Sequence, residues 1–238
     1  MAMNLQHILF LDIETVSCEP SFDLLSDRMK PLWEKKAGLL KNDDLLPVHE
    51  LFFERAGIFA EFGKIVTIAV GYFVTTQEGL TLRVKAFASH DEKTLLEDFK
   101  QLLETHFDQS KLALCAHNGK EFDYPYICRR MLVHSIPPPR CLDIAGKKPW
   151  EVHHIDTLEM WKFGDRKNFT SLELLAALFE IPSSKSGIDG SMVNHTYYKE
   201  NDLDKIAHYC QMDVVVTAQL YLKFNCHPFI KEENIFLV

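Results

Sequence analysis

Two carboxylates stand close together in an otherwise apolar segment near the start of the sequence. Asp12 and Glu14 are two residues apart in 7–15, which reads H-I-L-F-L-D-I-E-T. This pattern predicts a strand that is buried at first and polar at its tip, and residues i and i+2 of a strand share one face. Two carboxylates on one face repel each other unless a cation lies between them, and such oxygen ligands suit Mg²⁺ or Mn²⁺. The alternative interpretation is a strand end that is simply solvated.

Two further aspartates could either stabilise the local structure or bind a metal ion. Asp123 starts a predicted helix in H-N-G-K-E-F-D, where the helix macrodipole also favours a carboxylate. Asp213 lies inside a long predicted helix and is followed by three valines, although aspartate is a poor helix former. A half-buried aspartate needs a partner, which is either a metal ion or a basic side chain. Tyr209, four residues before Asp213, shares its helical face.

The elements that must position these residues alternate between strands and helices. Residues 17–62 are irregular, with helices expected around 32–40 and 50–59, and we interpret them as an arm between the first two strands. A hairpin next to strands joined by helices predicts a mixed sheet with helices on its faces. The remaining predicted strands are 64–74, 81–88, 111–117 and 152–157, and the predicted helices are one from Ser89 or Asp91 to Phe107, then 122–133, one from Thr170 or Ser171 to Phe179, and 203–224.

Length and charge narrow the function classes. The chain has 238 residues, which suits one large domain or one domain with an inserted arm. Its formal net charge is −8, whereas proteins that grip long nucleic acid non-specifically usually carry a basic surface. Either nucleic acid is not the substrate, or the protein handles only a short end of it and uses metal ions to offset phosphate charge.

Cysteine usage and hydropathy indicate a cytoplasmic protein. The six cysteines are scattered and form no C-x-x-C pair, so we expect neither a zinc site nor a disulfide framework. No apolar run reaches the length of about 18 residues that spans a bilayer, and residues 1–7 do not resemble a signal peptide.

Three motifs in chain order carry a family resemblance. F-L-D-I-E-T, N-G-K-E-F-D and Y-x-x-x-D resemble the exonuclease motifs of the DEDD superfamily, and a tyrosine four residues before the last aspartate is similar to the DEDDy branch. The likeness is to the proofreading exonuclease domain of family-B DNA polymerases and to small stand-alone bacterial relatives. It covers about 8–222, including E-R-A-G-I-F-A-E-F-G-K-I-V-T-I-A-V-G and D-G-S-x-V at 189–193. Each motif alone is weak, but three in this order are specific.

The resemblance implies a fold and a reaction. The fold would be a ribonuclease H-like mixed five-stranded sheet of order 3-2-1-4-5 flanked by helices, in a single domain over 1–238 with an arm at about 17–62 and no polymerase domain. The reaction would be removal of nucleotides from the 3′ end of a nucleic acid, with single-stranded DNA the expected substrate. Two Mg²⁺ or Mn²⁺ ions, about 4 Å apart, would clamp the scissile phosphate.

The resemblance also implies residue roles. Asp12 would bridge both ions, Glu14 and Asp213 would complete the ion near the nucleophile, and Asp123 would support the second ion. Tyr209 would hydrogen-bond the attacking water, because a phenol with a pKa near 10 orients better than it deprotonates.

Other residues could contact the substrate or substitute for the tyrosine. His208 stands five residues before the last aspartate, the offset used by the DEDDh branch, but the Y-x-x-x-D context favours the tyrosine and places His208 beside the site or at the surface. Phe122 could equally belong to the core, and Lys185 could be a solvated loop residue. The residues expected to contact the substrate are Thr15, Asn118, Phe122 and Lys185.

Three alternative functions remain. The chain could be an inactive nucleic-acid-binding module of the same fold, an interaction protein whose acids are surface charges, or a hydrolase of short oligoribonucleotides or nucleotides. The expected partner is a nucleic acid with a free 3′ end and not a membrane. The acidic balance predicts weak, distributive binding unless a protein partner delivers the substrate.

Overall fold

One mixed sheet organises the described residues, which in this computed structural model are 5–77, 79–165, 167, 169–183 and 187–238. β1 (Ile8–Ser17), β2 (Gly63–Thr76) and β3 (Gly79–Ala88) pair with one another in antiparallel fashion. β4 (Ala113–Ala116) runs parallel to β1, β5 (Ile155–Asp156) runs parallel to β4, and β6 (Ile235–Leu237) runs parallel to β3. The expected ribonuclease H-like α/β fold and its strand order 3-2-1-4-5 are confirmed, but the expected number of five strands was wrong. Within the described residues the strands lie in the order β5-β4-β1-β2-β3-β6.

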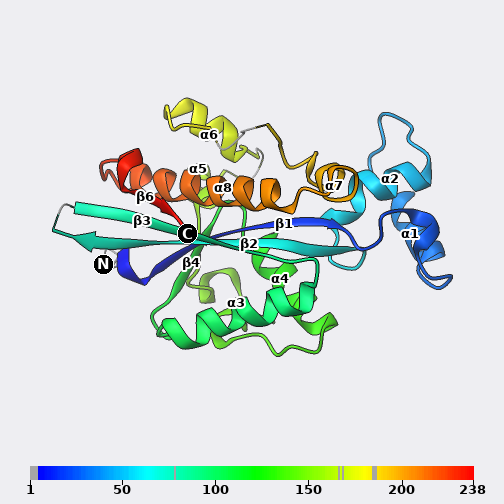
Figure 1. Cartoon of the computed structure of the whole chain (residues 1–238), viewed down its shortest axis with the longest axis horizontal. Coiled ribbons are helices and arrows are strands. Elements are labelled where there is room, and N and C mark those ends of the chain that lie inside the picture. The colour runs from blue at the N-terminus through cyan, green and yellow to red at the C-terminus, as the bar shows by residue number, and fades with distance from the viewer. Residues whose placement is uncertain (1–4, 78, 166, 168, 184–186) are drawn as a thin grey trace.

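Helices cover both faces of the sheet (Figure 1). α3 (Glu92–His106) and α4 (Asp123–Val133) bury one face, and α8 (Leu203–Phe224) buries the other. α6 (Leu172–Leu178) packs on the far side of α8 from the sheet, and α5 (Thr157–Lys162) follows β5 directly. None of the described helices is long and apolar enough to cross a membrane.

Small residues on β2 let α8 lie close to the sheet. A Cβ atom added to Gly71 would lie 2.7 Å from a methyl carbon of Val214 on α8, which is closer than two such atoms can pack. Ala69 is the β2 residue opposite Asp12, and it belongs to the same buried cluster as Val214. This close approach brings the middle of α8 over the polar half of β1.

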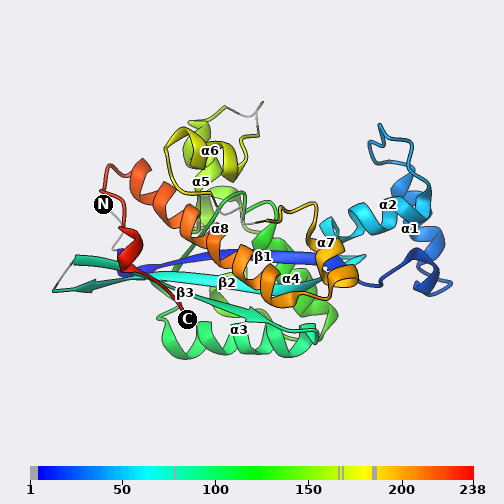
Figure 2. The ribbon, with the colours of Figure 1, turned by 45° about the horizontal axis from the view of Figure 1, so that its top comes forward.

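The arm between β1 and β2 has a hydrophobic cluster of its own. It contains α1 (Lys30–Ala37), α2 (Val48–Arg55) and the short 3₁₀ helices η2 (Phe22–Leu24) and η3 (Ala56–Ile58). Trp33 is fully buried at the centre of the cluster, and its ring packs edge-on against neighbouring phenylalanines. In Figures 1 and 2 the arm lies beyond the end of β1, away from the rest of the sheet.

Several short elements lie where no helix or strand was expected. α5 and β6 are short, and a third segment joins α7 (Val193–His195) to a π-helical turn η6 (Thr196–Glu200). The last of these lies between the predicted helix that ends at Phe179 and the predicted helix that begins at residue 203. Its presence matters because η6 leads into α8 and, with α7, faces the arm.

Candidate active site

β1 presents Asp12 and Glu14 on the face that α8 covers. Phe10, two residues earlier, packs in the cluster that β1 shares with α8, and successive residues of a strand alternate between faces. Asp12 is half-buried and Glu14 is buried. The register with β2 shifts between Glu14 and Thr15, so β2 contains one extra residue there. Such bulges often lie beside active sites because they redirect a side chain.

One turn of α8 faces these two carboxylates. Tyr209 and Asp213 are both buried, each with 8% of its surface exposed, and spacing of four places them on one helical face. The charge of Asp213 contributes to the raised pKa values of Asp12 and Glu14, so the three carboxylates interact. His208 is exposed on the same helix, as expected for a surface residue.

Asp123 reaches the site from the first turn of α4. It is 3% exposed, and its charge also raises the pKa of Asp12 and Glu14. The loop before α4 is held by Asp156, whose carboxylate accepts hydrogen bonds from the main-chain N–H groups of Asn118 at 3.0 Å and Lys120 at 3.1 Å. Asp156 also caps α5 through Leu158. One buried carboxylate therefore fixes the turn that places Asp123.

The four carboxylates form a strongly acidic buried cluster. Burial, together with repulsion from the neighbouring carboxylates, raises the pKa of Asp12 and Glu14 well above the usual range. Burial raises the pKa of Asp123 to about 7. In the described part of the chain, no ion pair joins Asp12, Glu14 or Asp123 to a basic side chain.

This cluster suits a divalent metal ion. Asp123 Oδ1 is buried and has no hydrogen-bond partner among the described residues. Thr67 Oγ1, on the β2 residue opposite Glu14, is likewise buried without a partner in this part of the chain. Buried polar atoms are rarely left unpaired, and hard oxygen donors are the ligands that Mg²⁺ and Mn²⁺ take.

Tyr209 is held as a neutral phenol. Burial raises its pKa far above the usual range, and the negative charges of Asp213, Glu14 and Asp12 raise it further. A hydrogen bond to Asp213 acts in the same direction. The hydroxyl is therefore a hydrogen-bond donor beside the carboxylates and not a base at ordinary pH.

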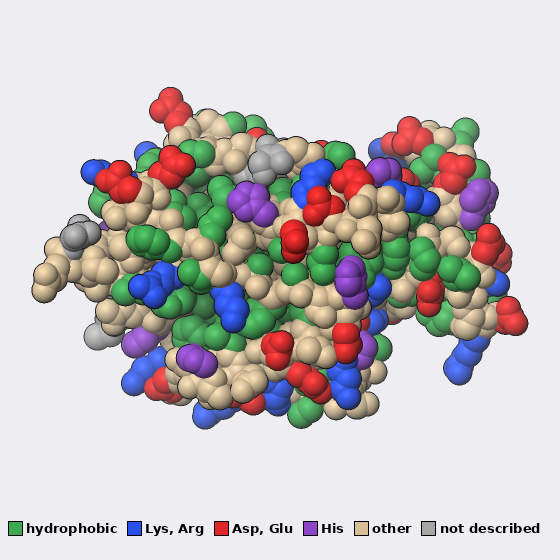
Figure 3. Space-filling model, viewed as in Figure 1, with side chains coloured by type: hydrophobic (Ala, Val, Ile, Leu, Met, Phe, Trp, Pro, Cys, Tyr) green, Lys and Arg blue, Asp and Glu red, His purple; other side chains and the backbone are tan. Residues whose placement is uncertain are grey.

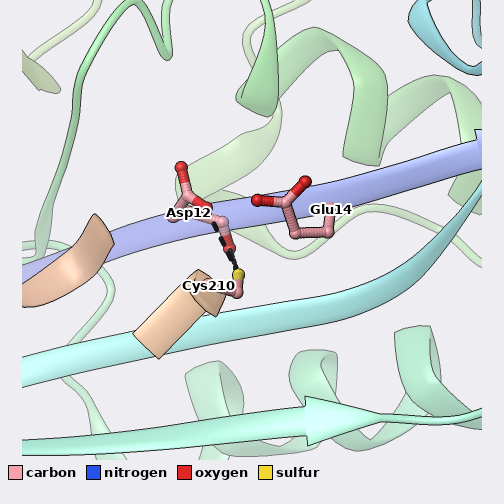
Figure 4. Close-up of side chains that lie close together, drawn as sticks. All are labelled: Asp12, Glu14 and Cys210. Carbon is pink, nitrogen blue, oxygen red and sulfur yellow. Dashed lines mark hydrogen bonds between the residues drawn. The ribbon is translucent and has the colours of Figure 1, made fainter. Parts of the chain in front are cut away.

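Cys210 joins the site, although sequence reasoning did not select it. Its Sγ donates to Asp12 Oδ2 at 3.3 Å and to the Asp12 main-chain oxygen at 3.4 Å, as Figure 4 shows. Single ligand atoms of Cys210, Asp12 and Glu14 lie within 4.8 Å of one another. The signal was available in the spacing, because a residue three positions before Asp213 shares its helical face.

A cleft of about 910 Å³ is lined by Ile13, Glu14 and Thr15 of β1 and by residues of the arm. Of the four carboxylates, Glu14 is among the described residues that line it, and residues of α2 and of the α7–η6 segment line it as well. Its acidic lining residues are Glu14, Asp23, Asp44, Glu50 and Glu54, and its basic ones are Arg55 and Lys199, with His49 beside them. On the face shown in Figure 3, acidic and basic side chains are likewise interspersed.

The residues expected to contact substrate are only partly brought together. Thr15 and Phe122 line the cleft. Asn118 is not among the described residues that line it. Its φ of +64° instead shapes the turn before α4, and its main-chain N–H donates to Asp156. Lys185 lies outside the described residues.

Comparisons with known proteins place the chain in a family. The family described as "Predicted 3'-5' exonuclease related to the exonuclease domain of PolB" matches residues 58–230. The matched segment contains Asp123, Tyr209 and Asp213, whereas Asp12 and Glu14 precede it and reach the site through β1. No curated protein matches the chain.

A solved structure shares the fold. It is the family B DNA polymerase from the hyperthermophilic archaeon Pyrobaculum calidifontis, with a TM-score of 0.55 and 14% sequence identity over 91% of this chain. The chain covers only 24% of the polymerase's length, and identity this low supports the fold alone. The family match extends over most of the sequence, so the chain belongs to the family of predicted 3′-5′ exonucleases related to the exonuclease domain of PolB.

Proposed function

We propose that the protein is a metal-dependent 3′-5′ exonuclease that hydrolyses the terminal phosphodiester of a nucleic acid strand, with single-stranded DNA as its substrate. The observation that carries the proposal is the convergence of Asp12, Glu14, Asp123 and Asp213 from β1, α4 and α8 into one buried cluster. Such a cluster is unfavourable in an unliganded interior. Divalent cations would relieve the repulsion.

Each carboxylate has a distinct place in the proposed site. Asp12 would be shared between two ions, Glu14 and Asp213 would hold the ion beside the attacking water, and Asp123 would serve the second ion through its unpaired Oδ1. Bound Mg²⁺ or Mn²⁺ would supply a hydroxide near neutral pH and offset charge on the phosphate. The protein would fix the ligand geometry with side chains that come from rigid elements.

Tyr209 would orient the attacking water through a hydrogen bond to its hydroxyl oxygen, because its one hydrogen is directed at Asp213. Its raised pKa supports this role because a phenol that stays protonated cannot act as the base. Thr15 and Phe122 would contact the terminal nucleotide, since both line the same cleft as Glu14.

The shape and charge of the cleft support a short single-stranded substrate. Its apolar lining includes Phe122, Phe53 and Ile58, on which unpaired bases could stack. Its acids outnumber its cations, which disfavours tight binding of a long polyanion. We infer that residues 1–238 act as one exonuclease domain in which the arm forms a wall of the binding cleft.

The test uses 5′-labelled single-stranded DNA and RNA of the same sequence, with Mn²⁺, Mg²⁺ or EDTA. Wild type should give a ladder that shortens from the 3′ end, and EDTA and Asp12→Ala should abolish it. Asp98→Ala is the matched control, because Asp98 is exposed on α3, on the opposite face of the sheet from α8. Turnover in Asp12→Ala equal to wild type would exclude this mechanism, and bound Mn²⁺ without cleavage would favour an inactive binding module.

A further inference from the structure

Cys210 makes the contact that holds Asp12 in place. Cys210 is fully buried in α8, next to Tyr209 and three residues before Asp213. Its sulfur lies 3.3 Å from Asp12 Oδ2 and 3.4 Å from the Asp12 main-chain oxygen. Figure 4 shows the thiol pointing from the helix to the strand. A thiol carries one hydrogen, so the two oxygens of Asp12 share one donor.

A hydrogen-bond donor stabilises the Asp12 carboxylate against repulsion from its acidic neighbours. Its carboxylate faces the repulsion of Asp213, Glu14 and Asp123. In the described part of the chain, the hydrogen bond that it accepts comes from Cys210. A carboxylate without this contact would be free to rotate away from its acidic neighbours.

The packing around the contact is built for close approach. β2 carries Ala69 opposite Asp12 and Gly71 beneath Val214, so α8 lies near enough to the sheet for a short side chain to reach Asp12. A longer side chain at position 210 would not fit in the same space, because the residue has no exposed surface.

We propose that Cys210 is a positioning residue, whose protonated thiol holds the Asp12 carboxylate in the orientation that binds the metal ions. The proposal rests on the function proposed above. It assigns the sulfur as a hydrogen-bond donor to a metal ligand and not as a ligand itself. Hydrogen-bond partners of metal ligands typically change metal affinity by roughly 10- to 100-fold when they are removed.

The experiment measures Mn²⁺ affinity without nucleic acid, by following free Mn²⁺ with electron paramagnetic resonance. Cys210→Ala and Cys210→Val both remove the donor, and valine also fills the space, so the two separate the hydrogen bond from the cavity. Each should weaken Mn²⁺ binding by roughly tenfold. Cys210→Ser keeps a donor and should recover most of the affinity.

Cys115 provides the matched control. It is fully buried on β4, in the same hydrophobic cluster as Cys210, and has no hydrogen bond to Asp12. Cys115→Ala should lower thermal stability to a similar extent as Cys210→Ala and leave Mn²⁺ affinity unchanged. On single-stranded DNA, the donor-free variants at position 210 should require more Mn²⁺ for half-maximal activity.

Two results would overturn the positioning role. One is wild-type Mn²⁺ affinity in both Cys210→Ala and Cys210→Val, and the other is a serine variant that binds no better than the alanine variant. Neither result would affect the exonuclease proposal if wild type still cleaves. Wild-type protein that neither binds Mn²⁺ nor cleaves would instead refute the proposed function itself.

Discussion

At the scale of single residues, the ionisation of Tyr209 separates two mechanisms. A tyrosine that loses its proton could act as a base, whereas one that stays neutral can only orient water. Burial and three nearby carboxylates raise the pKa of the phenol, which supports the proposed role of Tyr209 in orienting the water. His208, the residue beside it, is exposed and does not compete for this position.

Tyr209→Phe should lower kcat by roughly 10- to 100-fold, which corresponds to one hydrogen bond lost at a charged centre. KM should change little, because the hydroxyl is expected to contact the water and not the nucleotide. Steady-state kinetics on a labelled single strand measure both constants, with His208→Ala as the matched control on the same helix. A steep loss in His208→Ala with near-normal activity in Tyr209→Phe would reverse the assignment.

At the scale of elements, local patterns predicted the long segments and missed several of the short ones. β1, β2, α3 and α8 have strong hydrophobic periodicity, and the predicted cap of α3 at Asp91 is present. β6 has three residues and exists because it pairs with β3, a contact between distant parts of the chain. No local pattern encodes such pairing.

The segment before α8 shows the same limit for helices. Its π-helical turn η6 is held by tertiary contacts, because Tyr198 donates to the Ser17 main-chain oxygen and His90 is hydrogen-bonded to Tyr197. The candidate site likewise contains residues that local sequence patterns predicted and one, Cys210, that they did not. Motif spacing predicted the four carboxylates and Tyr209, whereas the contact of Cys210 with Asp12 depends on how closely α8 approaches the sheet.

His154 is hydrogen-bonded to main-chain groups of two separate segments, and its protonation should make the free energy of unfolding depend on pH. Its Nδ1 accepts from Leu114 N–H on β4, and its Nε2 donates to the Cys141 main-chain oxygen, so both ring nitrogens are occupied in the neutral form. Burial lowers the pKa of His154 to about 4. The unfolded chain, with a histidine pKa of about 6.5, binds the proton more readily between these values.

Stability from His154 is therefore fully present above about pH 6.5 and is lost as pH falls towards 4. Between pH 7 and pH 5 the loss should be about 2 kcal/mol. Urea unfolding of wild type and His154→Gln at the two pH values measures it. The variant should lose less stability on acidification than wild type, and an equal loss in both proteins would contradict the neutral buried histidine.

At the scale of the whole molecule, the acidic net charge and the few cations in the cleft beside the arm both predict weak binding of a nucleic acid strand. The net charge of −8 does not favour tight, non-specific binding of a long nucleic acid. The lining of the cleft includes two cations, Arg55 and Lys199, which under the proposed function would contact phosphates of the bound strand. Lys199 lies over the ring of Phe53, so a phosphate contact and a base-stacking surface are adjacent.

Two phosphate contacts predict weak salt dependence. For single strands each contact contributes a slope of about −0.7 to log K against log[salt], so raising salt from about 50 to about 200 mM should weaken binding by roughly sevenfold. Lys199→Ala should reduce the slope by about 0.7. Fluorescence anisotropy with a labelled single strand measures this salt dependence in the Asp12→Ala background, which should not cleave.

Lys223→Ala is the control. Lys223 is also exposed above phenylalanine rings but lies at the far end of α8, so its substitution should leave the slope unchanged. A slope unaffected by Lys199→Ala would place the strand outside the cleft, and a slope several times steeper would mean that the protein grips a long strand despite its charge.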